Sequence, residues 1–417
     1  MDFALAVIGT GYVGLPLVRE AVKAGIPTYG FDVDVARVAE MRSGRSRVDD
    51  VPDEDLAWML DAGFTPTTDP HDLDGCNVYV ICVPTPLTSD GGPDLAAVIA
   101  SATMIAGRLS AGDLVVLEST TYPGTTEEVV GPILEASGLS VGKDVHLAFS
   151  PERIDPGNPR FGLRNTPKVV GGVDERSTDR AAQFYSQVCD TVVVASGTRE
   201  AELAKLLENT YRHVNIALVN ELAQLAHELG IDLWESIRCA STKPFGFQPF
   251  YPGPGVGGHC IPIDPNYLSF HVRSRLGHSF RFVELAQEIN SIMPAYVARR
   301  AQDLLNEAGK AVKGSRVLLL GVTYKANIDD QRESPARSLA TALDHLGAEL
   351  HYWDPYVTSW APDGTPVPRV EDLVATADDV DCVILLQNHQ ELSAEILAAF
   401  GDRLLDTRGV SATGRRL

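Results

Sequence analysis

The sequence predicts an α/β protein with two doubly wound domains, each built on a mainly parallel sheet, joined by a long central helix and a helical region. Three observations favour this fold class. A strand-like run ending in a glycine-rich turn begins the chain, and helical and strand-like segments alternate after it. One long helical pattern follows, and a second strand–turn–helix series begins near residue 317. Because 417 residues exceed a typical single core, we divide the chain into domains at 1–198, 199–310 and 311–417.

The composition excludes some partner classes. The 44% hydrophobic and 22% charged fractions are ordinary for a soluble globular protein. The net charge of −21 argues against nucleic acid as a partner, although a small anionic ligand needs only a local cluster of donors. No apolar run approaches the roughly 18 residues that span a bilayer, and the first ten residues read as a strand and not as a signal peptide. We therefore expect neither nucleic acid nor a membrane as a partner.

The six cysteines show no CxxC pair and no Cys/His spacing typical of a metal site, so no metal is expected. Cys76, Cys82 and Cys382 lie in or beside strand-like runs and are expected in the core. Unpaired thiols of this kind fit a reducing cytoplasm.

The first turn is the clearest binding motif. An apolar run over residues 3–9 leads into GTGYVG at 9–14, a helical pattern follows, and a second strand at 28–31 ends at Asp32. A GxGxxG turn between a strand and a helix, with an acid eighteen residues further on, is typical of a Rossmann-like dinucleotide-binding domain. The glycines let the backbone approach a pyrophosphate at the helix N-terminus.

Asp32 favours NAD as the cofactor, because a carboxylate accepts hydrogen bonds from the ribose hydroxyls and repels a 2′-phosphate. Arg37 and Arg42 nearby leave NADP open at this point, and a glycine turn without a ligand is the alternative to a cofactor site. The cofactor contacts expected in this part of the chain are Gly9, Gly11, Tyr12, Val13, Gly14, Asp32 and Arg37.

Polar turns follow the next strands at 78–83, 114–117 and 145–149. These turns are expected at the carboxyl edge of the sheet, where α/β proteins bind ligands. Thr85 and Thr120 are therefore candidate cofactor contacts, although turn chemistry alone would explain them. Glu152, in the third turn, could act as a general base or simply start a helix.

A long helix is predicted over 199–229 from the spacing of its apolar residues. Lys205 and Asn209 are four residues apart and share a face, and apolar neighbours would partly desolvate a lysine that points inward. A solvated lysine is the alternative. A helix of this length could bridge domains or pack against a second subunit.

The stretch Tyr251–Pro265 places Cys260 behind four glycines and four residues before Asp264. Glycines allow close approach to a ligand, and the interleaved prolines stiffen the segment, so it is unlike a flexible linker. The alternative is a surface loop with an incidental thiol. Helical sequence follows over 266–309, with a break expected near Pro294.

The last α/β unit has strands at 317–320, 349–353, 382–386 and 404–406. It lacks GxGxxG, but its first turn places Lys325 and Arg332 at a strand edge, where such cations suit a diphosphate.

Taken together, these motifs resemble the UDP-glucose/GDP-mannose dehydrogenase family. The residues that carry the resemblance are GTGYVG with Asp32, VPTP at 83–86, ESTTYPGTT at 118–126, SPE at 150–152, AKLLENT at 204–210, GPGVGGHCIPID at 253–264 and YKANIDDQRESP at 324–335. The resemblance implies an NAD-binding Rossmann domain, a central helical dimerisation region and a C-terminal nucleotide-binding domain. It also implies two successive oxidations of C6 of a nucleotide sugar, with two NAD.

The resemblance further implies a role for each matching residue. Cys260 would be the nucleophile that traps the aldehyde intermediate, and Lys205 and Asn209 would stabilise the oxyanion. Asp264 would act as a base through a water, and Glu152 would assist thioester hydrolysis. The implied catalytic residues are Cys260, Lys205, Asn209, Asp264, Glu152 and Thr120. The further implied cofactor contacts are Thr85, Thr120 and Arg332. The implied substrate contacts are Glu152, Lys205, Asn209, Tyr251, Gly255, Gly257 and Lys325.

The stretch 242–268 looks most like the branch of the family that oxidises UDP-N-acetylglucosamine. The same chemistry on UDP-N-acetylmannosamine, UDP-glucose or GDP-mannose is the alternative, because isoleucine at 263 replaces a lysine common in UDP-glucose dehydrogenases. A two-electron β-hydroxyacid dehydrogenase and a non-catalytic NAD-binding protein are more remote alternatives.

Overall fold

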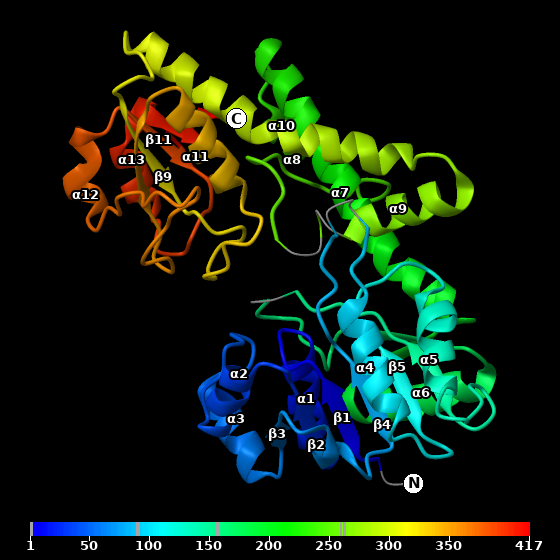
Figure 1. Ribbon diagram of the computed structural model, residues 1–417. Coiled ribbons are helices and arrows are strands. Elements are labelled where there is room, and N and C mark those ends of the chain that lie inside the picture. Colours follow the sequence, from blue (N-terminus) through cyan, green and yellow to red (C-terminus); the bar gives the residue numbers. More distant parts are fainter. Residues whose placement is uncertain (1–2, 89–91, 156–157, 259–260, 262–263) are drawn as a thin grey trace. The chain divides into compact units, whose positions relative to one another are not determined.

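The computed structural model describes residues 3–88, 92–155, 158–258, 261 and 264–417. The chain forms two compact units, 1–208 and 209–417 (Figure 1). The boundary between the units falls inside one long helix, and the division into three domains stays a prediction.

The first unit contains an eight-stranded sheet. Its strands are β1 (Leu5–Ile8), β2 (Thr28–Phe31), β3 (Thr65–Thr67), β4 (Val78–Ile81), β5 (Leu114–Leu117), β6 (His146–Phe149), β7 (Lys168–Gly172) and β8 (Val192–Val194). They lie in the order β3-β2-β1-β4-β5-β6-β7-β8, and among the paired strands only β6 and β7 run antiparallel. The strand order reverses between β1 and β4, which is the point where doubly wound sheets bind ligands.

Helices cover both faces of this sheet (Figure 1). They are α1 (Gly14–Lys23), α2 (Val35–Arg42), α3 (Asp53–Asp61), α4 (Ala96–Ala106), α5 (Gly131–Glu135) and α6 (Glu175–Val188), with a π-helical turn at Thr126–Val130. Alternate residues of β1 enter two separate cores: Leu5 and Val7 pack with α1 and α6, whereas Ala6 and Ile8 pack with α4. Burial on both faces explains why these strands are continuously apolar in sequence.

The helix α7 (Thr198–Glu228) leaves the first unit and enters the second, within one residue of the predicted 199–229. The second unit adds α8 (Leu233–Ala240), α9 (Asp264–Leu276), α10 (Arg281–Glu307), α11 (Pro335–His345), α12 (Leu373–Thr376) and α13 (Ala394–Ala399). Its strands are β9 (Arg316–Leu320), β10 (Glu349–Trp353), β11 (Cys382–Leu385), β12 (Leu404–Asp406) and β13 (Arg415–Arg416).

The second sheet is parallel, in the order β10-β9-β11-β12-β13. Alternate residues of β9 again face two cores, one shared with α10 and α11 and the other with α12 and α13. The strand order reverses between β9 and β11. The predicted α/β class with two doubly wound sheets and a long helix is therefore confirmed.

The break expected near Pro294 is wrong. The helix α10 runs through Pro294 without interruption, and the helical sequence breaks instead at Gly277, whose φ of +72° is left-handed. An interior proline costs a helix about 3 kcal/mol, partly because it cannot donate to the carbonyl four residues earlier, here that of Asn290. Gly255 lies against this position, since a Cβ on it would come within 3.5 Å of the Asn290 carbonyl oxygen and 3.6 Å of the proline ring.

The cysteines expected in the core are buried. Burial raises the pKa of Cys76 and Cys382 to about 12, and it raises the pKa of Cys82 well above its ordinary value. These thiols therefore stay protonated at neutral pH and are unsuited to act as nucleophiles.

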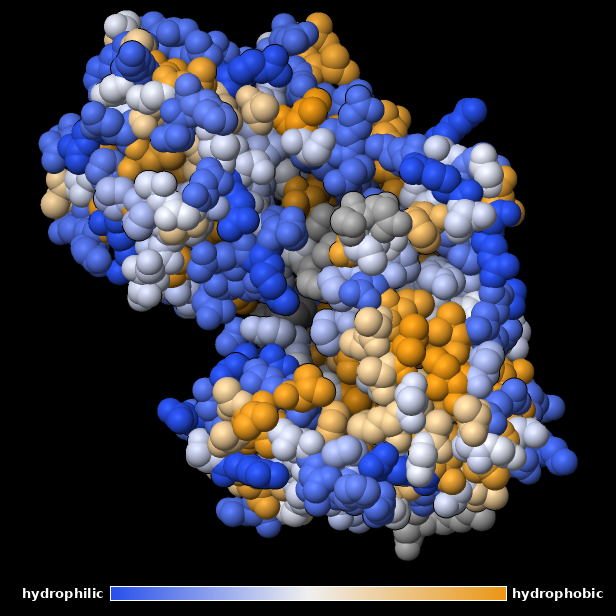
Figure 2. All heavy atoms as spheres, viewed as in Figure 1, coloured by the Kyte–Doolittle hydropathy of each residue, from blue (hydrophilic) through white to orange (hydrophobic). Residues whose placement is uncertain are grey.

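Hydrophobic residues gather at the surface over α4, where Ile99 is exposed (Figure 2). Among the helices of the described residues, none is long and apolar enough to cross a membrane.

Candidate active site

The glycine turn after β1 has the geometry that a dinucleotide needs. A Cβ on Gly9 would lie 2.7 Å from the Cys82 carbonyl oxygen, and one on Gly14 would lie 2.0 Å from the Gly9 carbonyl oxygen, so only glycine fits. A Cβ on Gly11 would meet no atom within 4 Å, so the backbone there faces open space. The turn leads into the N-terminus of α1, which no described side chain caps, and the positive end of the helix dipole there suits a pyrophosphate. Tyr12 and Val13 of the same turn pack partly against the core.

Asp32 follows β2 and is buried at the same edge of the sheet. Its carboxylate accepts hydrogen bonds from the Thr10 amide at 3.0 Å, the Thr10 hydroxyl at 2.9 Å and the Asp34 amide at 3.0 Å. The Arg37 guanidinium lies 3.0 Å from it. Burial alone would raise the pKa of Asp32, but these hydrogen bonds and the Arg37 charge outweigh burial and hold the pKa below its ordinary value. An anionic Asp32 suits a ribose with free hydroxyls better than one with a 2′-phosphate.

The turns after β4 and β5 are joined directly. The Thr85 hydroxyl donates to the Thr120 carbonyl oxygen at 2.8 Å, and the Ser119 hydroxyl donates to the Val83 carbonyl oxygen at 2.7 Å. The structure therefore brings the two threonines predicted as cofactor contacts together at the carboxyl edge of the sheet.

Glu202 of α7 holds the far end of the Thr120 turn. Its buried carboxylate accepts hydrogen bonds from the Gly124 amide at 2.6 Å, the Thr126 amide at 2.9 Å and the Thr126 hydroxyl at 2.7 Å. Burial raises the pKa of Glu202 to about 7 although these hydrogen bonds lower it.

A buried ion pair lies beneath two of the turns. Lys168 Nζ lies 2.9 Å from a Glu118 carboxylate oxygen and donates to the Pro151 carbonyl oxygen at 3.3 Å. Tyr185 donates a hydrogen bond to the same carboxylate. Because Glu118 begins the Thr120 turn and Pro151 precedes Glu152, Lys168 connects the bases of both turns.

Lys205 and Glu152 form a buried pair within the first unit. Lys205 Nζ donates to the Glu152 carbonyl oxygen at 2.7 Å and lies 3.1 Å from a Glu152 carboxylate oxygen. Their side chains are 7% and 10% exposed, which excludes the alternative of a solvated lysine. The lysine charge therefore lies in a largely desolvated environment, where its electrostatic effect is stronger than in water.

Asn209 and Asp264 form a pair within the second unit. Asn209 Nδ2 donates to an Asp264 carboxylate oxygen at 2.5 Å, and Asp264 is buried in the first turn of α9. Cys260, the predicted nucleophile, lies outside the described residues.

The glycine loop at 253–258 packs tightly against the second sheet's first turn. A Cβ on Gly257 would lie 2.8 Å from the Tyr324 side chain and 2.7 Å from the Glu333 carbonyl oxygen, and one on Gly258 would lie 2.8 Å from the Tyr324 ring. The Gly258 amide donates to the Arg332 carbonyl oxygen at 3.2 Å. The glycines predicted to approach a ligand are thus also required for close contact within the protein.

The start of this loop is fixed by buried amides from two helices. Asn220 of α7 accepts a hydrogen bond from the Gly253 amide and donates one to Asn290 of α10, both at 2.9 Å. Asn290 also contacts the His213 ring at 3.3 Å, and burial lowers the pKa of His213 to about 4.

Tyr251 stacks on Trp234, with ring centroids 5.6 Å apart and an interplanar angle of 13°. A Cβ on Gly409 would lie 2.4 Å from the Trp234 ring, so this ring is held between Tyr251 and the turn after β12. Tyr251 is 53% exposed, which leaves surface for a ligand.

Lys325 and Arg332 both lie in the segment after β9. Lys325 is partly exposed, and the Arg332 guanidinium pairs with Asp330, with Nη2 2.6 Å from a carboxylate oxygen. Contacts of either residue with a cofactor or substrate stay predictions.

Comparison with known proteins decides the family. Domain models of the UDP-glucose/GDP-mannose dehydrogenase family match three segments: the NAD-binding domain at residues 3–189, the central domain at 199–292 and the UDP-binding domain at 318–413. The chain belongs to the UDP-glucose/GDP-mannose dehydrogenase family. It is therefore an oxidoreductase, an NAD-dependent UDP-sugar dehydrogenase, as the motifs predicted.

Individual family members are similar over most of their length. The UDP-N-acetyl-D-glucosamine 6-dehydrogenase of Pseudomonas aeruginosa is 37% identical over 361 residues, which cover 86% of this chain and 84% of that protein. The UDP-N-acetyl-D-mannosamine dehydrogenase of Pyrococcus horikoshii is 33% identical over 392 residues, covering 94% and 90%. A solved structure of the UDP-D-ManNAc dehydrogenase from Pyrococcus horikoshii matches with a TM-score of 0.88 and 32% identity, covering 99% of each chain.

Several residues that build this family member's site were missed in the sequence. Glu202, Lys168 and Asn220 each hold a turn by contacts with residues far along the chain. Two signals could have found them: the polar residues 202, 205, 209, 213 and 220 recur at helical spacing, and Lys168 begins an apolar strand.

Proposed function

We propose that this enzyme oxidises C6 of a UDP-sugar twice, from alcohol to carboxylate, through a covalent intermediate on Cys260. The observation that carries the proposal is α7, on which Lys205 is bonded to Glu152 and Asn209, four residues on, is bonded to Asp264. These are the residue types that the chemistry needs: carboxylates to move protons, and a lysine and an amide to stabilise an oxyanion.

In the first oxidation, Asp264 accepts the proton of the C6 hydroxyl through a water. Bound NAD supplies the hydride acceptor, once in each oxidation, so two NAD are reduced per sugar acid. The residues that would hold it are the glycine turn and Asp32, and both fit, because Gly11 faces open space and Asp32 is anionic.

In the second oxidation, the Cys260 thiolate adds to the C6 aldehyde, and Lys205 and Asn209 stabilise the oxygen of the thiohemiacetal. Hydride loss from C6 gives a thioester. Water then attacks the thioester with Glu152 assisting, which forms the carboxylate and returns the thiol.

The substrate we propose is UDP-N-acetylglucosamine. The 37% identical relative carries this name, and residues 242–268 resemble that branch. Relatives named for UDP-N-acetylmannosamine are 33% identical, so that sugar is the main alternative, ahead of UDP-glucose and GDP-mannose.

We also propose that the enzyme is a cytoplasmic homodimer formed through α7. The support is a stripe of exposed apolar residues on this helix, which we call the α7 stripe: Leu203, Leu207, Tyr211, Leu218, Leu222, Leu225 and Leu229 just beyond its end. A face of this kind is characteristic of protein interfaces.

The proposal is tested by incubating the purified enzyme with NAD and each of the four nucleotide sugars, while NADH and product mass are measured. We expect two NADH per UDP-N-acetylglucosaminuronate and the highest kcat/KM for UDP-N-acetylglucosamine. Absence of a sugar acid with all four substrates, or one NADH per product, would contradict the four-electron reaction.

Cys260→Ala should abolish net formation of the acid, because no thioester can form. The matched control is Cys239→Ala, which removes an exposed thiol and should leave turnover unchanged. Full turnover by the Cys260→Ala enzyme would remove this cysteine from the mechanism.

A further inference from the structure

Three segments meet at the carboxyl edge of the second sheet. Asp354 directly follows β10, the segment 321–334 follows β9, and His389 lies four residues after β11. The strand order reverses between β9 and β11, so two of these segments flank the position where doubly wound sheets bind ligands.

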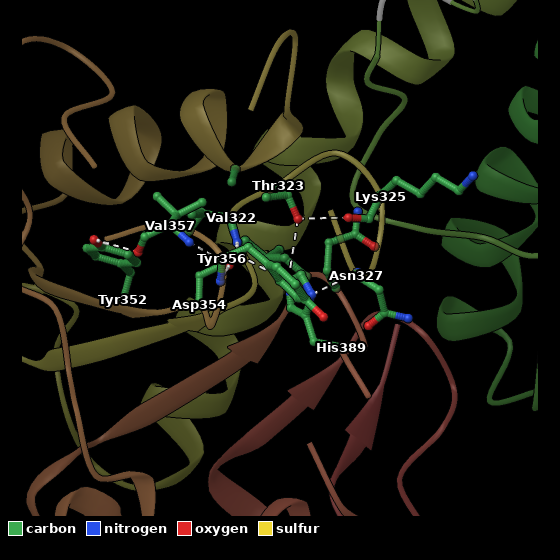
Figure 3. Close-up of polar contacts among 12 residues, drawn as sticks. Val322, Thr323, Lys325, Asn327, Tyr352, Asp354, Tyr356, Val357 and His389 are labelled. Carbon is green, nitrogen blue, oxygen red and sulfur yellow. Dashed lines mark hydrogen bonds and ion pairs between the residues drawn. The ribbon is translucent and has the colours of Figure 1, made fainter. Parts of the chain in front are cut away.

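Asp354 and His389 form a fully buried pair, with both side chains 0% exposed (Figure 3). His389 Nε2 lies 3.1 Å from an Asp354 carboxylate oxygen, and His389 Nδ1 lies 3.0 Å from the Asn327 amide nitrogen. A backbone amide only donates, so Nδ1 must be the acceptor and Nε2 must carry the proton. The contacts therefore fix one neutral tautomer of His389.

Asp354 is the anion that keeps this tautomer in place. Its carboxylate also accepts hydrogen bonds from the amides of Val322 at 2.8 Å, Tyr356 at 2.9 Å and Val357 at 3.2 Å. Burial alone would raise the pKa of Asp354, but the hydrogen bonds, led by that from His389, outweigh burial and hold the pKa below its ordinary value.

The Asn327 amide to which His389 bonds belongs to a strained turn. Asn327 has a φ of +65°, a left-handed conformation that few residues other than glycine and asparagine adopt. The Asn327 side-chain oxygen accepts a hydrogen bond from the Gln390 backbone amide at 2.8 Å. The Gln387 side-chain amide donates to the Tyr324 carbonyl oxygen at 2.7 Å. Contacts from the segment after β11 therefore hold the turn in this conformation.

The same turn carries the residues that face the glycine loop. The Tyr324 ring packs against Gly257 and Gly258. The Lys325 side chain extends away from the Asp354–His389 pair, while its carbonyl oxygen accepts a hydrogen bond from Thr323 at 2.8 Å (Figure 3). A shift of the turn would therefore move Lys325 and also the Tyr324 ring, against which Gly257 and Gly258 pack.

We propose that Asp354 and His389 are positioning residues for nucleotide-sugar binding, which fix the 323–330 turn through the single His389 tautomer. The inference rests on the proposed function, since it assumes that Lys325 meets the diphosphate. Loss of the pair weakens binding of the UDP moiety and leaves NAD binding, which depends on the first unit, unchanged.

Three full-length variants test this. His389→Phe replaces the imidazole by a phenyl ring, which has no nitrogen to donate or accept a hydrogen bond. Asp354→Asn replaces one carboxylate oxygen by an NH2 group, which then faces either His389 Nε2–H and the Val322 amide or the amides of Tyr356 and Val357. His389→Gln is the matched rescue, because its amide can accept from Asn327 and donate to Asp354.

Binding of UDP is measured by calorimetry, together with KM for the nucleotide sugar and for NAD. Because each variant leaves buried hydrogen-bonding groups without a suitable partner, we expect UDP binding and the sugar KM to worsen about tenfold in His389→Phe and Asp354→Asn. In His389→Gln, UDP binding and the sugar KM should stay within about threefold of the parent values. The KM for NAD should stay within about twofold of the parent value in all three variants. Imidazole ¹⁵N spectra should show a His389 signal with unprotonated Nδ1 that is lost in His389→Gln and altered in Asp354→Asn.

Folded His389→Phe and Asp354→Asn enzymes that bind UDP as tightly as the parent would overturn the inference, as would a parent His389 protonated at Nδ1. If His389→Phe does not fold, Asp354→Asn, which preserves side-chain volume, decides by the same criterion. A parent enzyme that binds no UDP would contradict the proposed function itself, which separates the two failures.

Discussion

Glu202 shows how a buried carboxyl group can hold a neighbouring turn while making the stability of the protein depend on pH. It fixes the Thr120 turn through three hydrogen bonds, yet burial raises its pKa to about 7, above its ordinary value of 4.5. A raised folded-state pKa means that the folded protein binds the proton more tightly than the unfolded chain. The stabilisation is therefore complete below about pH 4.5 and is lost as pH rises through about 7.

Glu202→Gln should remove this pH dependence. On the scale of 1.36 kcal/mol per pKa unit, the free energy of unfolding of the parent should fall by roughly 3 kcal/mol relative to the variant between pH 4 and pH 8. Urea unfolding of both proteins at the two pH values measures the change. Glu200→Gln, at an exposed position two residues earlier, is the control and should show no such trend. An equal pH dependence in parent and Glu202→Gln proteins would refute the assignment.

Motif residues and their supporting residues differ in how well the sequence reveals them. Gly9 and Gly14 are required within the glycine turn itself, because Gly9 has a φ of +93° and a Cβ on Gly14 would lie 2.0 Å from the Gly9 carbonyl oxygen. His389 and Lys168 act through partners 62 and 17 residues away, and no local pattern marks such contacts. Sequence reasoning therefore found the groups expected to touch ligands and missed the groups that hold them.

The helix α7 buries polar as well as apolar residues. Glu202, Lys205 and Asn209, at spacings of three and four, share one face and bind three different segments. The leucines of the α7 stripe are exposed instead. The apolar period correctly predicted a helix, but it could not show that these polar residues are buried, because their hydrogen-bond partners lie in other segments of the chain.

The exposed leucines lead to a prediction about assembly. Leu218→Glu with Leu222→Glu places two charges on the α7 stripe, where burial in a dimer would be unfavourable. Light scattering should give a dimer for the parent and half that mass for the double variant. Val374→Glu, at another exposed apolar position, on α12, is the control and should stay dimeric. A monomeric parent, or a dimeric double variant, would contradict assembly through this stripe.

The two units differ in the ligand that each is built to bind, and this leads to a prediction for the whole protein. The switch point of the first sheet presents the glycine turn and Asp32, and that of the second presents Lys325 and the turn held by His389. In hydrogen–deuterium exchange, NAD should slow exchange at residues 9–14 and 119–126, and UDP should slow exchange at 321–330 and 386–390.

NADP serves as the comparison ligand in this experiment, because Asp32 disfavours its 2′-phosphate and protection at 9–14 should be weaker. Protection of the first glycine turn by UDP alone, or equal protection by NAD and NADP, would contradict this distribution of sites.

At the scale of the chain, the sequence predicted two α/β units and most of their strands, since doubly wound topology follows from alternating strands and helices. It did not predict the strands β3, β7, β8 and β13 or the uninterrupted α10. Two of these depend on tertiary packing: β7 pairs with β6, and Pro294 lies where Gly255 packs against the Asn290 carbonyl.

The packing of Gly255 has a consequence for the order in which the protein is assembled. A Cβ at this position would come within 3.0 Å of Pro335, which is made eighty residues later on the ribosome. Gly255 can contact Asn290 and Pro294 once α10 has been synthesised. Its contact with Pro335 requires that β9 and the segment after it have been synthesised as well. Contacts between residues so far apart form late, because the intervening chain must first be ordered. The glycine loop at 253–258 therefore takes its final packing only after much of the second unit has been synthesised.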